Sequence, residues 1–135
     1  MLSESRRVLE SSVAEIPTSE LMRQARLIRD KTFGSRVTYS PKVFIPLTML
    51  CRDKCGYCTF AQPPAKLENP YLLAEQVLAI AKQGAKAGCH EALFTLGERP
   101  ELRYEVARDW LKQNNYDSTV HYLHDMAALV LKETG

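Results

Sequence analysis

The chain has 135 residues, which is enough for one ordinary domain and too few for two. Hydrophobic residues make up 45% of it and charged residues 25%, as in a globular protein, and no apolar run reaches the length of a membrane span. The 18 basic and 16 acidic side chains leave a net charge of +2, which gives no support for binding to nucleic acid or to a membrane surface. Four cysteines without an apolar leader after Met1 predict a reducing, cytoplasmic location and argue against a secreted disulfide framework.

Residues 1–36 are expected to form a helical extension ahead of the main domain. Ser12 stands three residues before Glu15, in the pattern of a helix capping box. Pro17 then opens a clearer helix, and Gly34 is a natural end for it. Apolar residues recur on one face of this helix at Leu21, Ala25 and Ile28.

The main domain is expected to occupy residues 37–135 and to belong to the α/β class. Three segments are rich in β-branched, aromatic and other apolar residues and are therefore predicted to be strands: Val37–Ser40, Lys42–Thr48 and Glu91–Leu96. Pro46 has no N–H to donate to a ladder, so its strand must be irregular or lie at an edge there.

Helical segments separate and follow these strands. Asn69 is expected to cap a helix that begins at Pro70 and stops at Gly88, which gives a strand–helix–strand unit with parallel pairing. A second helix ends near Asn114, and Ser118 is expected to cap a third. The expected inward faces of the three helices are Leu73, Val77, Ile80 and Gly84, then Tyr104, Ala107 and Leu111, then Val120, Leu123, Ala127 and Val130.

The strongest chemical signal is the sequence CRDKCGYC directly after the Lys42–Thr48 segment. It places Cys51, Cys55 and Cys58 on one loop, separated by three and then two residues. Cysteine thiolates hold iron–sulfur clusters, and a cubane with only three protein ligands leaves one iron open to a small molecule. The motif therefore predicts three metal ligands at a site with an open coordination position.

Other potential ligands fit a metal site less well. A structural zinc site usually takes four ligands in paired short spacings, and Cys89 and His90 could complete such a set only from a distance in the sequence. Cys89 follows Gly88 and precedes an apolar run, which is more typical of a small buried hydrophobe. His121 and His124 lie three apart on a helix with no carboxylate or cysteine expected at a matching spacing, so they are interpreted as surface or packing residues.

The spacing CxxxCxxC, with the aromatic Tyr57 before the last cysteine, resembles the radical S-adenosylmethionine superfamily. The resemblance implies a 4Fe-4S cluster on Cys51, Cys55 and Cys58, with S-adenosyl-L-methionine bound to the open iron and Tyr57 packed on the cluster near the adenine. The reduced cluster of these enzymes splits the sulfonium and releases a 5′-deoxyadenosyl radical.

The same resemblance implies the amino-terminal part of a (β/α) TIM-type barrel with only about two barrel strands, because a complete barrel takes roughly 250 residues. Site residues of such barrels follow the carboxyl ends of the strands. The superfamily often has Gly-Gly-Glu after the second strand; here Leu96 replaces the first glycine, and Gly97 and Glu98 are implied to bind the methionine end of the cosubstrate. Two strands leave an open edge and a small core, so we expect a marginally stable, inactive fragment of an enzyme.

Within this superfamily, several segments together resemble the 7,8-didemethyl-8-hydroxy-5-deazariboflavin synthase family, either its ring-closing subunit or the amino-terminal half of a bifunctional form. The segments are Phe44–Thr48, Leu50–Asp53, Tyr57–Phe60, Ala92–Glu101 and Ser118–Val120. This implies a lyase that closes the deazaflavin ring of a hydroxybenzyl-ribitylaminouracil adduct with loss of ammonia, together with a partner radical synthase or fused half and an electron donor. The alternatives are another radical enzyme, of the thiazole or menaquinone pathway type, and a non-enzymatic iron–sulfur or zinc module.

Overall fold

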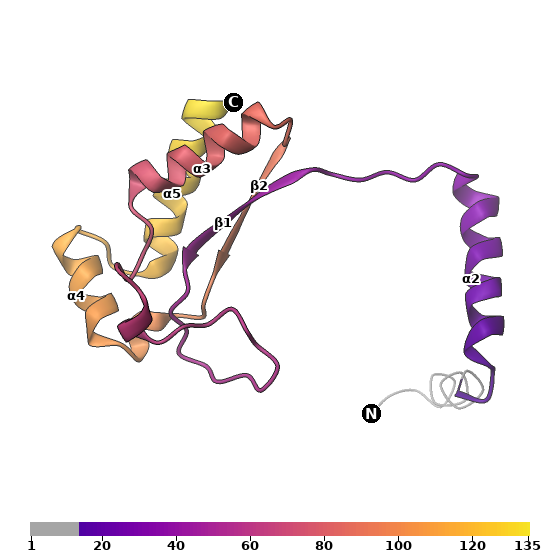
Figure 1. Ribbon diagram of the computed structural model, residues 1–135, viewed down its shortest axis with the longest axis horizontal. Coiled ribbons are helices and arrows are strands. Elements are labelled where there is room, and N and C mark those ends of the chain that lie inside the picture. The colour runs from indigo at the N-terminus through magenta and orange to yellow at the C-terminus, as the bar shows by residue number, and fades with distance from the viewer. Residues whose placement is uncertain (1–13) are drawn as a thin grey trace. The chain divides into compact units, whose positions relative to one another are not determined.

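The computed structural model describes residues 14–135, so Ser12 and the rest of residues 1–13 lie outside the described part of the expected extension. The described residues fall into two compact units, which divide between Tyr39 and Ser40. Over the described residues, no helix combines the length and the apolar character that a bilayer crossing requires. The elements are α2 (Thr18–Phe33), β1 (Lys42–Thr48), the 3-10 turn η1 (Pro64–Lys66), α3 (Ala74–Lys86), β2 (Glu91–Leu96), the 3-10 turn η2 (Pro100–Leu102), α4 (Glu105–Gln113) and α5 (Thr119–Thr134) (Figure 1).

Helix α2 belongs to the first unit and confirms the helix expected between Pro17 and Gly34. The carbonyl of Pro17 accepts a hydrogen bond from the Glu20 N–H at 2.9 Å, which closes the first turn. The side chain of Glu20 also pairs with Arg23 at 2.7 Å. Gly34 has a φ of 62°, a left-handed value that suits glycine, and it ends the helix.

The prediction of a strand at Val37–Ser40 is wrong. The ladder between β1 and β2 starts only at Lys42, which is paired with Glu91. Val37 and Tyr39 are 78% and 88% exposed, and no strand is assigned to this segment. Composition favoured a strand here, but a strand also requires a neighbouring backbone to accept and donate its hydrogen bonds.

The second unit is built on the parallel pair of β1 and β2, with α3 in the crossover between them. The pairing joins Lys42 to Glu91 at its start and Pro46 to Thr95 near its end, after which Leu47 is skipped before pairing resumes. The skipped residue is a β-bulge, and it directly follows the proline that cannot donate to a ladder. The α/β class, the parallel pairing and the irregularity at Pro46 are therefore confirmed.

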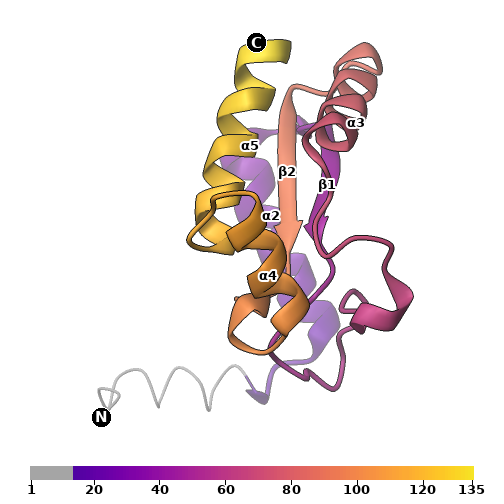
Figure 2. The same ribbon diagram turned by 90° about the vertical axis from the view of Figure 1, so that its left-hand side faces the viewer.

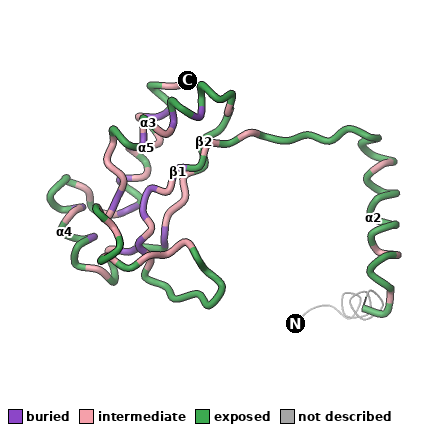
Figure 3. The backbone as a smooth tube through the Cα atoms, viewed as in Figure 1, coloured by how far each residue is buried: buried purple, intermediate pink, exposed green. Residues whose placement is uncertain are grey.

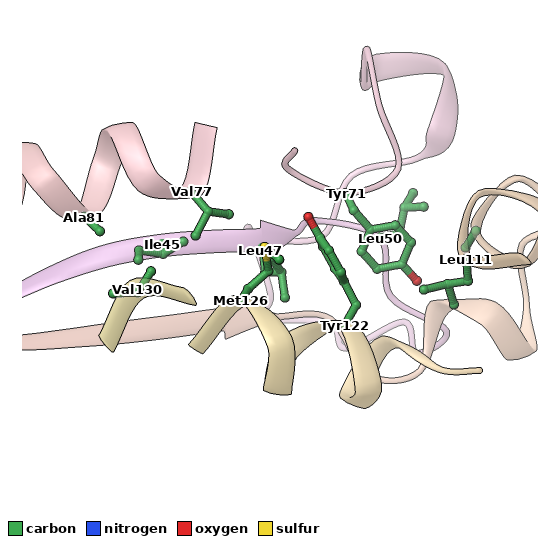
Figure 4. Close-up of a cluster of buried hydrophobic side chains, with 11 residues drawn as sticks. Ile45, Leu47, Leu50, Tyr71, Val77, Ala81, Leu111, Tyr122, Met126 and Val130 are labelled. Carbon is green, nitrogen blue, oxygen red and sulfur yellow. The ribbon is translucent and has the colours of Figure 1, made fainter. Parts of the chain in front are cut away.

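Helices α3 and α5 cover one face of this two-stranded sheet (Figure 1, Figure 2). The buried parts of the second unit follow β1 and the helix faces turned toward it (Figure 3). In Figure 4, Val77 and Ala81 of α3 and Val130 of α5 lie around Ile45, next to Leu47 of the same strand. The buried apolar residues are Ile45, Leu47, Leu50, Tyr71, Val77, Ala81, Ala107, Leu111, Tyr122, Met126 and Val130.

The other face of the sheet carries Phe44 and Leu93, which are paired in register. They are 50% and 49% exposed, respectively. The ring of Phe60, from the loop after β1, lies edge-on to Phe44 with the ring centroids 6.2 Å apart. The core of the second unit is thus one-sided.

The expected start of α3 is wrong, because the helix begins at Ala74 rather than at Pro70 with Asn69 as its cap. The preceding residues are held against β1, where the N–H of Leu72 donates to the carbonyl of Leu47 at 2.9 Å. This tertiary hydrogen bond keeps the chain extended past a proline that is otherwise well suited to the first turn of a helix. The expected inward residues that are buried in α3 and α4 are Val77, Gly84, Ala107 and Leu111.

Helix α5 begins as expected, because the hydroxyl of Ser118 accepts a hydrogen bond from the His121 N–H at 3.1 Å. Its expected inward face is wrong at Val120, which is 59% exposed. The helix instead turns Tyr122 inward, and the phenol donates to the carbonyl of Leu72 at 2.6 Å. An aromatic ring buries more apolar area than a valine, which favours this rotation. The buried residues of α5 are Thr119, Tyr122, Met126 and Val130.

A buried polar network joins three connections of the second unit. The Tyr71 hydroxyl lies 2.7 Å from Oγ1 of Thr119, which in turn donates to a carboxylate oxygen of Glu101 at 2.6 Å. Tyr71 and Thr119 are each 1% exposed, and the Trp110 ring lies 4.8 Å from the Tyr71 ring between centroids. The network fastens η2, which follows β2, to the start of α5 and to the segment before α3.

We expect alkaline pH to destabilise this core. Burial, with a further contribution from the charge of Glu101, raises the pKa of Tyr71 to about 12, and burial also raises the pKa of Tyr122. The folded state therefore favours the neutral phenol. The neutral Tyr71 contributes up to about 2 kcal/mol to the free energy of unfolding. This contribution is complete below the unfolded pKa of about 10 and is lost as the pH rises to about 12.

Urea unfolding between pH 9 and 12 measures this effect. The Tyr71→Phe variant should lose less stability over that interval than the parent chain, because it has no phenol to ionise at this position. Tyr39→Phe is the matched control, because Tyr39 is 88% exposed. This variant should lose as much stability between pH 9 and 12 as the parent chain. Equal slopes for the parent and Tyr71→Phe would contradict the expectation.

Candidate functional site

The loop with the three cysteines leaves the carboxyl end of β1 (Figure 1). Hydrogen bonds of the Thr48 side chain and of the backbone close its base. Oγ1 of Thr48 donates to the carbonyl of Pro70 at 2.7 Å and accepts from the N–H of Leu50 at 3.1 Å. Leu50 is fully buried, and the carbonyl of Met49 accepts from the N–H of Gln62 at 2.8 Å. The residues on both sides of the loop are therefore fixed to the core.

Cys51 is the cysteine that the fold holds most firmly. Its Sγ accepts hydrogen bonds from the N–H groups of Asp53 at 3.4 Å and Glu98 at 3.3 Å. The Arg52 N–H donates to the carbonyl of Glu98 at 2.9 Å. Arg52 and the Cys51 sulfur are thus both hydrogen-bonded to the segment that follows β2. The guanidinium of Arg103 donates to the carbonyls of Cys51 and Arg52 at 3.4 and 3.1 Å.

Gly97 makes this close approach possible. Its N–H donates to the carbonyl of Thr48 at 3.2 Å. A Cβ at this position would lie 1.9 Å from the carbonyl oxygen of Leu50 and 2.7 Å from the Cβ of Cys51. Only glycine fits between the two strand ends, and through it Glu98 reaches Cys51.

Cys55, Tyr57 and Cys58 lie on the outer arm of the loop. The Cys58 N–H donates to the carbonyl of Cys55 at 3.1 Å and closes a turn, but both cysteines are exposed and Tyr57 is 90% exposed. Among residues 14–135, no three His, Cys, Asp or Glu side chains gather closely enough to hold a metal ion. The fold therefore brings Cys51, Gly97 and Glu98 together, whereas it does not gather the three predicted cysteine ligands into one metal-binding group.

The chemistry of the donor set fits a cluster with three protein ligands. Cys51, Cys55 and Cys58 are free thiols on one loop, and the two N–H groups at the Cys51 sulfur are of the kind that tune iron–sulfur clusters. The fit requires the outer arm to close on Cys51, because the thiols are not gathered in the structure.

The zinc alternative through Cys89 and His90 does not fit the fold. These residues directly precede β2, and their N–H groups bond the carbonyls of Gly84 and Pro41 at 3.0 and 3.1 Å. The cysteine loop follows the opposite end of the parallel pair, and a six-residue strand is about 20 Å long. Cys89 and His90 therefore lie too far away to share a metal ion with the cysteines of the loop.

The two histidines of α5 have carboxylate neighbours, contrary to the prediction. Nδ1 of His121 lies 3.6 Å from Asp117, and Nδ1 of His124 lies 3.1 Å from Asp125. Each pair is separate and largely exposed at the histidine, and neither belongs to a group of three potential ligands within residues 14–135. They are surface pairs.

Arg103 is the residue of this site that sequence reasoning missed. It belongs to no sequence motif, because it contacts the backbone carbonyls of Cys51 and Arg52, which are 52 and 51 residues earlier in the chain. Arg103 directly follows η2, and its contact with the cysteine loop depends on the fold.

Comparisons with known proteins confirm the resemblance inferred from the motifs. An FO synthase of Nocardia farcinica is 49% identical over 126 residues, covering 87% of this chain and 15% of the relative. A 7,8-didemethyl-8-hydroxy-5-deazariboflavin synthase of Methanopyrus kandleri is 50% identical over 97 residues, covering 72% of this chain and 29% of the relative. An FO synthase of Mycobacterium tuberculosis is 52% identical over 103 residues, which is 73% of the chain and 12% of the relative. The chain thus spans less than a third of the length of each of these relatives.

No model of a protein family matches the chain. No solved structure matches it either.

Proposed function

We propose that this chain is part of a radical S-adenosylmethionine lyase that forms the deazaflavin chromophore 7,8-didemethyl-8-hydroxy-5-deazariboflavin. The observation that carries the proposal is the 50% identity to a protein named as the synthase of this compound. The substrate would be the hydroxybenzyl-ribitylaminouracil adduct, closed to a ring with loss of ammonia. A partner radical synthase, or a fused second half, would supply the adduct. A reducing cytoplasm suits the four free thiols.

In this proposal Cys51, Cys55 and Cys58 hold a 4Fe-4S cluster. Such a cluster, when bound and reduced by an electron donor, supplies the electron that cleaves the sulfonium of S-adenosyl-L-methionine. Cys51 is already fixed against the end of β2, so it would set the position of the cluster while the outer arm closes. This division of roles is supported by the two N–H donors at Cys51 and the exposure of the other two thiols.

Gly97, Glu98 and Tyr57 would bind the cosubstrate. Glu98 is exposed and its N–H meets the Cys51 sulfur, so its carboxylate would be available to the ammonium of the methionine end in a charge-assisted hydrogen bond. Gly97 keeps this segment close to the cluster ligand, and the exposed ring of Tyr57 is free to pack on the adenine. The sheet would be the first part of a (β/α)8 barrel, and turnover would require the further barrel strands.

Anaerobic reconstitution with iron and sulfide tests the proposal. The chain should take up about four iron and four sulfide ions, as a cubane requires, and give an electron paramagnetic resonance signal on reduction. Adding S-adenosyl-L-methionine should change that signal, because the cosubstrate binds the open iron. Cys51→Ser should lose iron, whereas Cys89→Ser, the matched control away from the loop, should bind as much as the parent.

Two results would contradict parts of the proposal. Zinc bound in place of iron, with no labile sulfide, would overturn the cluster and with it the radical chemistry. A cubane whose signal is unchanged by S-adenosyl-L-methionine would overturn the assignment of cosubstrate binding to Gly97 and Glu98 within this chain.

A further inference from the structure

Arg103 is attached to the cysteine loop at two successive carbonyl groups. The same nitrogen, Nη1, lies 3.4 Å from the oxygen of Cys51 and 3.1 Å from that of Arg52. These two carbonyls belong to two successive peptide groups, Cys51–Arg52 and Arg52–Asp53, and the contacts restrain both. The first of these peptide groups is bonded to the Cα of Cys51, so its orientation is coupled to the direction of the Cys51 side chain. Arginine suits this role, because its guanidinium is always charged and presents several N–H donors in a fixed plane.

The other end of Arg103 is attached to the core. Its N–H donates to the carbonyl of Pro100 at 3.0 Å, and Pro100 is buried. The neighbouring Glu101 accepts the hydrogen bond of Thr119 at 2.6 Å, which ties η2 to the start of α5. The guanidinium carbon lies 5.0 Å from the ring centroid of Tyr104, a cation–π contact that further restrains the side chain.

We propose that Arg103 is a positioning residue that fixes the backbone of Cys51, so that its sulfur keeps the direction in which Glu98 N–H meets it. The role of Cys51 as a cluster ligand rests on the proposed function, whereas its position does not. Without Arg103, the loop would keep its closed base but lose the restraint on the first cysteine. The Cys51 thiol would become more accessible, and the loop would hold iron less well.

Thiol labelling tests the positioning without any metal. In a chain with Cys55, Cys58 and Cys89 replaced by serine, the rate of reaction with a disulfide reagent reports on Cys51 alone. We expect Arg103→Ala to raise this rate by about threefold or more, because local opening controls the access of reagent to a half-buried thiol. Arg103→Lys, which keeps a cation and donors, should restore part of the protection.

Two matched controls separate positioning from general loosening of the fold. Arg108→Ala removes an exposed arginine of α4 that also donates to a backbone carbonyl, that of Glu101 at 3.0 Å, without touching the cysteine loop. It should leave Cys51 labelling unchanged. In a second chain with Cys89 as the only cysteine, also partly buried, Arg103→Ala should not accelerate labelling.

The outcomes distinguish this inference from the proposed function. Faster labelling of Cys51 alone, with less iron retained by Arg103→Ala than by Arg108→Ala in the otherwise unsubstituted chain, would support both. Faster labelling of Cys51 in a chain that binds no iron in any form would support the positioning and overturn the cluster. Unchanged labelling of Cys51, or equal acceleration at Cys89, would overturn the positioning role.

Discussion

Replacing Gly97 with alanine should abolish the iron–sulfur binding proposed for this chain. The new Cβ would lie 1.9 Å from the carbonyl oxygen of Leu50 and 2.7 Å from the Cβ of Cys51. Leu50 is fully buried and the clashing atom is backbone, so a side-chain rotation cannot relieve the contact. The ends of β1 and β2 must separate, which moves Cys51 away from Glu98 and costs about 2–3 kcal/mol of stability, as overpacking does.

Iron and sulfide per chain after anaerobic reconstitution measure the effect. Gly56→Ala is the matched control, because it adds the same methyl group within the cysteine loop at a place with nothing within 4 Å. It should bind as much iron as the parent. Full iron binding by Gly97→Ala would show that the close approach of the two strand ends is not needed for the site.

Replacing Gly84 with alanine should strongly destabilise the second unit, although alanine is the better helix former by about 1 kcal/mol. A Cβ there would lie 2.4 Å from the Cβ of Val43 and 2.7 and 2.9 Å from its two methyl carbons. Gly84 is buried in α3, and Val43 lies on β1, so the helix would be pushed away from the sheet. We expect a net loss of about 2 kcal/mol, since the overpacking outweighs the gain in helix propensity.

Urea unfolding of four chains tests this prediction. Val43→Ala combined with Gly84→Ala should recover part of the loss, because the smaller side chain makes room for the new methyl group and the two changes are not additive. Gln83→Ala, on the exposed side of the same helix, should change stability by less than about 0.5 kcal/mol. A chain with Gly84→Ala alone that is as stable as the parent would disprove the close packing of α3 on β1.

Elements with a local cause were predictable from the sequence. Ser118 caps its helix by bonding three residues ahead, and Pro46 disturbs its strand because it lacks an N–H; neither depends on distant parts of the chain. The start of α3 was missed because Leu72 bonds to the carbonyl of Leu47, 25 positions earlier. Such a contact overrides the local preference of the proline, and only the fold reveals it.

The candidate site divides in the same way. The three proposed ligands Cys51, Cys55 and Cys58 could be predicted from their spacing, because all three lie on one loop. The sequence could suggest that Glu98 lies near them, since parallel strands end at the same edge of a sheet. Arg103 could not be predicted in this way, because its partners are backbone carbonyl oxygens, which every residue possesses.

The residue skipped in the pairing of β1 also sets the orientation of everything that follows it. Up to and including the skipped Leu47, odd-numbered residues such as Ile45 face the core; after it, the even-numbered Thr48 and Leu50 do. Cys51 therefore falls on the open side, whereas an uninterrupted alternation would have directed it toward the core. The number of residues between the strand and the first cysteine thus matters as much as their identity. A deletion of one residue there would turn the Cys51 thiol toward the core, whereas most substitutions would leave it on the open side.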